Sequence, residues 1–301
     1  MKKYKYLALA VLAAVISGLA NFVNKLALNN FADPVQYTFL KNLVAVICLF
    51  ALIYPSLKNF KLGTTKNLPW IKFLLIGLGG GGLAFIWYFK GLAQTSAINA
   101  SFIHKTLFVW IACLAVFWLK EKINWQQYAG LAILFGGNYL LFGQFTWLNQ
   151  PGDYLVFLAT LIWAVEFILA KNLLANYSPL MVGFSRLLIG LPLIALFVSP
   201  KNLLIWQFNL NQWLWLGLTG VLLALFISTW YLALKNLSVT TVSTILVVAS
   251  PITTILQTIF VTHNFVIKQG IIYGIFIIGV FLVVKYRSNY NNNYDPILNK
   301  I

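Results

Sequence analysis

Lys105 and Glu166 are the strongest candidates for binding a charged group, because each interrupts a long apolar stretch. Lys105 follows His104 and lies seven residues into the stretch 98–118, and Glu166 lies five residues before Lys171. A charge at the centre of a membrane-spanning helix costs about 2.5–3.5 kcal/mol, so such charges are usually paired or functional. An ammonium and a carboxylate that face one cavity could hold the two ends of a zwitterion, or could neutralise each other.

These side chains also have alternative roles. Lys105 could extend its ammonium towards the membrane surface or form a structural ion pair. Glu166 could carry a proton, as could His104, or it could be the partner of a cation. An anionic group attracted by Lys105 and Lys25 is the alternative to a zwitterion. Lys105, Glu166 and His104 are therefore binding candidates.

A Trp-Tyr pair occurs twice, as Trp87-Tyr88 and Trp230-Tyr231, and Trp163 is a further aromatic candidate. Most Trp and Tyr residues of membrane proteins lie at the two membrane–water interfaces, which is the simpler interpretation here. Because the pair is duplicated, we expect it to form gates or walls of a binding cavity. Neutral groups that could orient a polar ligand are Asn21, Asn24, Asn99, Ser101, Thr253 and Gln257.

Composition indicates the elements that must position these residues. Of the 301 residues, 61% are hydrophobic and only 9% are charged, whereas soluble domains have about 25% charged residues. A bilayer-spanning helix needs roughly 20 apolar residues, so the chain is an all-α membrane protein with room for about ten. The continuous apolar runs exclude a transmembrane β-barrel.

The remaining composition excludes several other kinds of site. Cys48 and Cys113 lie in apolar runs, and neither histidine has a partner at metal-ligand spacing, so we expect no disulfide, metal site or cofactor. The formal charge of +16 lies between spans and at the termini. It therefore indicates membrane topology rather than nucleic-acid binding.

We expect ten helices, with prolines 34, 69, 151 and 179 at helix starts, where the missing N–H costs nothing. The segment after Lys2 resembles a signal peptide, but its apolar character continues to Leu28, so we expect it to be the first span. The expected helices are 6–28, 35–54, 70–90, 98–118, 126–145, 153–172, 179–199, 212–232, 239–261 and 268–286.

The distribution of Lys and Arg predicts the orientation. With the N-terminus inside, fourteen basic residues fall on the inner side and three (Lys90, Lys201, Lys268) on the outer side, and four lie within spans, which completes the 21. This asymmetry predicts two cytoplasmic termini. The scarcity of Arg against abundant Lys, Asn and Ile favours a bacterial plasma membrane. The inner group is Lys2, Lys3, Lys5, Lys58, Lys61, Lys66, Lys72, Lys120, Lys122, Lys171, Lys235, Lys285, Arg287 and Lys300.

The sequence indicates an internal duplication of one five-span module. Pro34 and Lys41 match Pro179 and Arg186 at an offset of 145 residues, so Asn21 corresponds to Glu166. Five spans per module is an odd number, so the copies have opposite orientations, as in secondary transporters with a midplane site. We expect a first repeat at 1–145, a second at 146–287 and a disordered cytoplasmic tail at 288–301.

Lys41 and Arg186 are expected to share a structural role, contacting carbonyls or headgroups near the span ends. The run Gly77, Gly79-Gly80-Gly81-Gly82 resembles a phosphate-binding loop only superficially, because the following Lys and Ser/Thr are missing. Small residues that allow close helix packing are the better interpretation, and we expect the same of Gly136 and Gly137.

Several motifs together resemble the drug/metabolite transporter superfamily, of which the EamA-type branch is the best match over residues 6–286. They are the two five-span modules, the sequence TSAINA at residues 95–100 that enters helix 4, and the sequence LKE at 119–121 that ends it. The chain departs from the family where Phe108 replaces a proline and where His263-Asn264 replaces the second acidic residue. The resemblance implies ten helices around a cavity lined by helices 1, 3, 4, 6, 8 and 9.

The expected function is secondary transport of a small polar or amphipathic metabolite, preferably an amino acid or related compound, by alternating access. The expected partners are this substrate and the lipid bilayer, and proton coupling and oligomeric state stay open. The alternatives are transport of an anionic metabolite or amphipathic drug, and a non-transporting, lipid-related accessory subunit. A membrane enzyme would need clustered acidic or histidine residues, and the five acidic residues are scattered.

Overall fold

The computed structural model describes residues 2–57, 69–92, 94–95, 97–142, 149–198, 208–263 and 267–286. Within these ranges the chain is helical and contains no strand. The elements are α1 (Lys2–Leu28), α2 (Pro34–Leu57), α3 (Trp70–Leu74), η2 (Leu75–Leu83), α4 (Ala84–Leu92), α5 (Ala97–Lys105), α6 (Leu107–Leu119), α7 (Trp125–Phe142), α8 (Pro151–Asn176), α9 (Pro179–Ala195), α10 (Leu210–Asn236), α11 (Val239–Leu246), α12 (Ala249–Gln257), η5 (Thr258–Thr262) and α13 (Ile267–Lys285).

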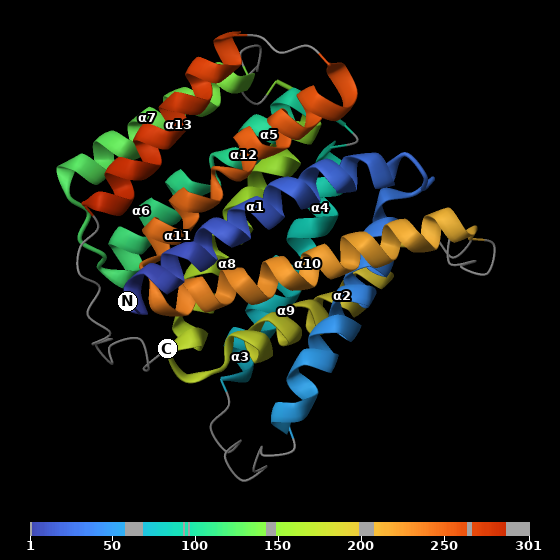
Figure 1. Cartoon of the computed structure of the whole chain (residues 1–301). Coiled ribbons are helices and arrows are strands. Elements are labelled where there is room, and N and C mark those ends of the chain that lie inside the picture. Colours follow the sequence, from blue (N-terminus) through green and yellow to red (C-terminus); the bar gives the residue numbers. More distant parts are fainter. Residues whose placement is uncertain are drawn as a thin grey trace.

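These elements form the ten predicted spans, so the prediction of an all-α, ten-helix membrane fold is confirmed (Figure 1). Seven segments are long and apolar enough to cross a bilayer, and α9 and α13 contribute shorter apolar helices. Three spans consist of more than one element. The third is α3, η2 and α4, the fourth is α5 and α6, and the ninth is α11, α12 and η5.

The fourth and ninth spans are interrupted at equivalent positions, which the prediction of continuous helices missed. The first break follows Lys105 and the second follows Leu246. At each break one amide, that of Thr106 in the fourth span and that of Val248 in the ninth, bonds to the carbonyl three residues earlier, at 3.1 Å in each case. Pro251 explains the second break, because proline lacks the amide that would bond to residue 247. In the first, the Thr106 hydroxyl donates to the Ile103 carbonyl at 2.6 Å.

Most close packing joins the first five spans to the last five. Spans α1 and α10 run side by side, as do α7 and α13 (Figure 1). The inverted counterpart of the α1–α10 contact is the contact of α8 with η2 and α4. Likewise, the contact of α1 with α12 corresponds to that of α8 with α5 and α6. Each repeat therefore buries its apolar surface mainly against the other, so that both build the centre of the bundle.

The glycine-rich η2 is the place of closest approach. A Cβ on Gly77 would lie 2.5 Å from the Ile189 side chain on α9, and one on Gly81 would overlap the Arg186 carbonyl. The prediction of close helix packing is confirmed for this run. It is also confirmed for Gly137, which faces Phe276, but it is wrong for Gly136, which has nothing within 4 Å.

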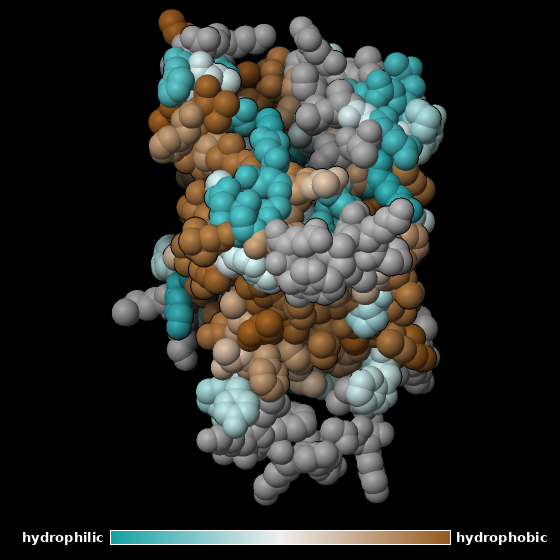
Figure 2. All heavy atoms as spheres, turned by 90° about the vertical axis from the view of Figure 1, so that its right-hand side faces the viewer, coloured by the Kyte–Doolittle hydropathy of each residue, from teal (hydrophilic) through white to brown (hydrophobic). Residues whose placement is uncertain are grey.

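The surface agrees with a membrane environment. One face of the bundle is mostly hydrophobic, with hydrophilic residues gathered in its upper part (Figure 2). The large apolar side chains that remain exposed include Ile47, Phe117 and Ile277, each more than half exposed. The predicted tail at 288–301 and the basic residues Lys58, Lys61, Lys66, Lys201 and Lys300 lie outside the described residues.

One basic residue of the predicted inner side is buried. Lys171 was counted among the cations of the inner side, but its side chain is only 2% exposed. Its ammonium donates to the carbonyls of Leu234 at 2.6 Å and Leu237 at 2.7 Å, at the end of α10. A cation at this position interacts favourably with the unsatisfied carbonyls of a helix C-terminus. Lys171 therefore joins α8 to α10.

Candidate functional site

Glu166 and Arg186 form an ion pair in the middle of the second repeat. Glu166 is the sixteenth of 26 residues in α8 and Arg186 is the eighth of 17 in α9, so both lie near the middle of their spans. Arg186 Nε lies 2.6 Å from Glu166 Oε1, and the side chains are 5% and 2% exposed. The contact brings the two opposite charges together out of contact with solvent. Tyr231 on α10 also donates its hydroxyl to Oε1 at 2.8 Å.

This pair revises two expectations. Glu166 was expected to share a cavity with Lys105 as a possible counter-ion, but its counter-ion is Arg186. Arg186 was expected to contact carbonyls or headgroups near a span end. It does contact a carbonyl, that of Gly80, but it is buried at the centre of α9. The signal that could have identified the pair is that Arg186 is the one arginine within a predicted span.

The Gly80 carbonyl connects this pair to the first repeat. Arg186 donates to it from Nη2 at 3.2 Å, and Trp163 donates to it from Nε1 at 3.0 Å. Gly80 belongs to η2, a π-helix, which is a geometry often found at functional sites. Its missing side chain is needed here, because a Cβ would overlap the Glu166 carboxylate. Sequence reasoning identified Gly80 only as a packing residue.

Trp163 lies at the centre of an aromatic cluster between α4, α5 and α8. Its ring centroid is 5.5 Å from Tyr88, 5.4 Å from Phe85 and 4.9 Å from His104. The expectation that Trp163 lies near a span end is wrong, because it is the thirteenth of 26 residues in α8. Tyr88, Phe85 and His104 are half-buried. Trp87 packs against the same group.

Lys105 ends α5 beside this aromatic cluster. The residues on both sides of it contact the cluster, His104 through its ring and Leu107 through its side chain. Lys105 is half-buried and forms no hydrogen bond or ion pair with another described residue. The Nδ1 atom of His104 also has no hydrogen-bond partner within the described ranges. The described residues therefore leave both groups at this helix break without a protein partner.

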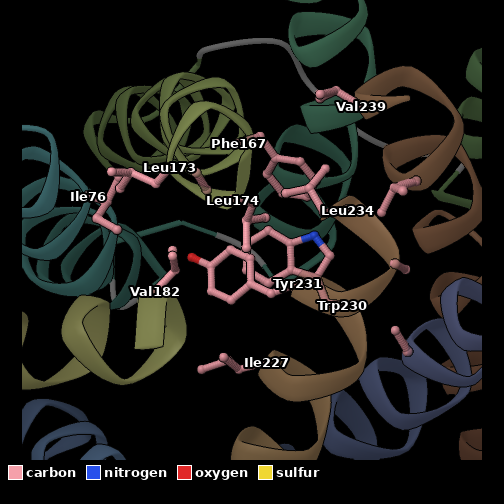
Figure 3. Close-up of a cluster of buried hydrophobic side chains, with 14 of the residues drawn as sticks. Ile76, Phe167, Leu173, Leu174, Val182, Ile227, Trp230, Tyr231, Leu234 and Val239 are labelled. Atoms are coloured by element: carbon pink, nitrogen blue, oxygen red, sulfur yellow. The ribbon is translucent and has the colours of Figure 1, made fainter. Parts of the chain in front are cut away.

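Trp230 and Tyr231 belong to the core rather than to a gate at a span end. Their exposed fractions are 2% and 0%, and their rings stack at a centroid distance of 4.2 Å. Figure 3 shows the two rings together among buried aliphatic side chains of several helices. The Arg186 guanidinium carbon lies 5.6 Å from the Trp230 ring centroid, within the range of a cation–π interaction. Trp230 and Tyr231 therefore contact Arg186 and Glu166, respectively, and help to hold the two charges together.

Two predicted polar residues lie apart from this cluster. Asn99 is buried and donates to the two carboxylate oxygens of Asp153 at 3.4 and 3.3 Å. Asp153 also accepts from the Thr95 hydroxyl and the Gln150 amide, which joins the start of α5 to the start of α8. Asn99 therefore has a structural partner rather than a free amide. Asn21, on α1, is exposed and does not take the place in the first repeat that Glu166 takes in the second.

Glu121, the last residue of the LKE motif at 119–121, makes a structural contact that the sequence interpretation did not predict. It follows α6 in the first repeat and accepts bonds from the Val239 amide at 2.7 Å and the Thr240 hydroxyl at 2.8 Å. These donors begin α11 in the second repeat, so the carboxylate caps a helix N-terminus. No group of three metal-ligating side chains occurs in the part of the chain that the structure describes.

Comparisons with known proteins agree with this architecture. A protein of Archaeoglobus fulgidus named as an uncharacterized transporter is 24% identical over 289 residues, which is 95% of this chain and 100% of its own length. A second of that name, from Methanothermobacter thermautotrophicus, is 23% identical over 297 residues, 91% of this chain and 84% of its own. A solved crystal structure, 18% identical, matches 92% of this chain and 97% of its own with a TM-score of 0.77, which shows a shared fold.

A family profile matches the chain twice, in agreement with the duplicated module inferred from Lys41 and Arg186. The two matches cover residues 4–143 and 150–285 and carry the description EamA-like transporter family. Together they include nearly all the described spans. The family and the relatives are named as transporters and not as enzymes. This chain belongs to the EamA-like transporter family.

Proposed function

We propose that this protein is a secondary transporter of a small polar or amphipathic metabolite with a carboxylate group, an amino acid or related compound. The repeats 1–145 and 146–287 alternate access to a central site between them. The observation that carries the substrate class is the position of Lys105. Its ammonium has no counter-ion among the described residues, and it lies at the break of the fourth span beside a half-buried aromatic cluster.

The ammonium of Lys105 would bind the substrate carboxylate, since a charge-assisted contact is stronger than a neutral one. His104 Nδ1, which has no partner in the described structure, would add a hydrogen bond. The rings of Trp163 and Tyr88 would pack against the apolar part of the substrate or against an amino group by a cation–π interaction. Glu166 would not be the main counter-ion of that amino group, because its charge is already paired with Arg186, and only its Oε2 has no partner in the described structure.

Transport of an anion without an amino group is the second candidate. It is supported by the excess of buried basic groups, because Lys41 also lies inside a span without a carboxylate partner in the described structure. Under either candidate the protein lies in a bacterial plasma membrane with both termini in the cytoplasm. Under either candidate, Glu166 or His104 would carry the proton if transport is coupled to protons.

Uptake and efflux by purified protein in liposomes test the proposal, with a pooled panel of amino acids, other carboxylates and neutral metabolites. Measurements with and without a pH gradient test proton coupling. We expect selective movement of carboxylate compounds, and we expect Lys105→Ala to remove it. The exposed Lys90 provides a matched control, and Lys90→Ala should transport normally. Transport that survives Lys105→Ala would discard this site, and no movement by folded protein would favour an accessory subunit.

A further inference from the structure

We propose that Lys41 forms a second anion-binding site, in the first repeat, that takes the carboxylate of a small soluble molecule. The site is centred on α2, and it shares Phe85 with the aromatic cluster beside Lys105. It follows from a comparison of the two bases that occupy equivalent positions in the repeats, Lys41 and Arg186. Both bases are buried, but only Arg186 has an anionic partner within the described ranges.

Lys41 is buried among aromatic side chains. It is the eighth of 24 residues in α2, and it is 5% exposed. Its Nζ lies 5.3 Å from the Tyr37 ring centroid, 6.0 Å from that of Phe85 and 5.9 Å from that of Phe89. These distances lie at the outer limit of cation–π contact. The rings stabilise a cation weakly and do not neutralise it.

The hydrogen bonding of Lys41 is also incomplete. Its one hydrogen bond is a long contact of 3.5 Å to Oδ1 of Asn24, which also accepts the Tyr37 hydroxyl at 2.5 Å. An ammonium has three donors, so two remain unused among the described groups. A buried charge without a counter-ion is costly, whereas a buried charge that binds an anion can repay its desolvation. A carboxylate would complete the site.

The second repeat shows the arrangement that is missing in the first. There, Glu166 is supplied by α8 and lies against Arg186. The equivalent of Glu166 in the first repeat is Asn21, which carries no charge and is exposed. Phe85 connects the two places, since its centroid is 5.8 Å from the Arg186 guanidinium carbon and 6.0 Å from Lys41 Nζ. A ligand carboxylate at Lys41 would therefore be the counter-ion in the first repeat, as Glu166 is in the second.

Three of the residues around this ammonium are partly accessible to a small ligand. Asn24, Phe85 and Phe89, which surround it together with the fully buried Tyr37, are half-buried. A short carboxylate such as acetate is therefore the suitable probe. Lys41 binds its anion whether or not Lys105 binds a transported substrate.

The test is thermal unfolding of the full-length protein in detergent, with potassium acetate replacing potassium isethionate at constant ionic strength. All samples carry Lys105→Gln, so that binding at Lys105 cannot contribute and failure of the transport proposal does not affect the result. We expect acetate to raise Tm by on the order of a few degrees at saturation. Chloride should raise it less, because a carboxylate can accept from two donors at once.

Two variants assign the effect to Lys41. Lys41→Met removes the charge and should abolish the acetate shift, whereas Lys90→Met, at an exposed lysine, should retain it. Asn24→Asp places a carboxylate at the atom that already contacts Lys41. It should raise Tm without acetate and abolish the acetate response. It also tests the site if Lys41→Met does not fold.

Three results would overturn the proposal. The first is that acetate does not raise the Tm of the Lys105→Gln protein. The second is that acetate raises the Tm of Lys41→Met or Asn24→Asp by as much as it does without these changes. The third is that chloride raises Tm as much as acetate does. Equal stabilisation by chloride would assign the site to an inorganic anion.

Discussion

Arg186 Nε lies 2.6 Å from Glu166 Oε1, and Tyr231 donates to the same carboxylate oxygen at 2.8 Å. The carboxylate therefore receives contacts from α9 and α10, and Arg186 extends the group to the Gly80 carbonyl on η2. Four spans from both repeats meet at this pair. The pair holds together the helices that alternating access would move, so its loss should affect stability as well as transport.

Breaking this ion pair from one side should be more harmful than removing both partners. Glu166→Gln leaves Arg186 buried without a counter-ion, and such a change costs about 3–5 kcal/mol. The double variant Glu166→Gln with Arg186→Met should be more stable than Glu166→Gln alone. Denaturant unfolding in detergent measures both. The single variant Arg186→Met completes the comparison. If the stability lost by the double variant equals the sum of the losses of the two single variants, the two residues act independently.

The transport of Glu166→Gln tests its role in proton coupling. If Glu166 is the proton carrier, the variant should move substrate at a rate that no longer responds to an imposed pH gradient. Liposome uptake at several external pH values provides the measurement. A variant with the pH profile of the unchanged protein would leave His104 as the remaining candidate.

Lys105→Gln should separate binding from stability. Lys105 has no partner among the described residues, so the change should leave Tm within a few degrees of the original value. Uptake of the carboxylate substrate should fall by at least tenfold, because loss of a charge-assisted contact costs about 1.5–3 kcal/mol. A large drop in Tm would instead identify Lys105 as a structural cation.

Gly80→Ala should inactivate the protein, whereas Gly136→Ala should not. A Cβ on Gly80 would overlap the Glu166 carboxylate, and the backbone of η2 cannot move away because its glycines pack directly against α9. A Cβ on Gly136 meets nothing within 4 Å, so the same change in a helix should be neutral or stabilise by about 0.5–1 kcal/mol. Expression, Tm and uptake of the two variants form a matched comparison. Equal behaviour would contradict the packing of η2.

Lys171→Met should destabilise the protein without altering substrate preference. Its ammonium satisfies carbonyls at the end of α10, and hydrogen bonds to charged groups contribute about 1.5–3 kcal/mol each. Lys122→Met changes an exposed lysine outside the helices and serves as the control, which should be unaffected. Unfolding in detergent compares the two. Unchanged stability of Lys171→Met would mean that water replaces this amine readily.

The number of spans, their approximate boundaries and the inverted duplication follow from the sequence alone. Apolar runs of bilayer length define helices because no other structure satisfies the backbone in lipid except a closed barrel. The repeated spacing from Pro34 to Lys41 and from Pro179 to Arg186 was sufficient to identify the duplication. The glycine run was also interpreted correctly as a packing surface, since its chemistry allows little else.

Only the tertiary structure decided which charges meet. Glu166 is 61 residues from Lys105 and 20 from Arg186 in the sequence, and neither separation indicates that Arg186 is its partner. The partner depends on the crossing of α8, α9 and η2, which side-chain packing determines and hydropathy does not encode. For the same reason the contact of Lys171 with the end of α10 was not predicted, and Lys41 was not distinguished from Arg186. Whether a buried base is satisfied depends on neighbours from distant segments, and the sequence does not give those neighbours.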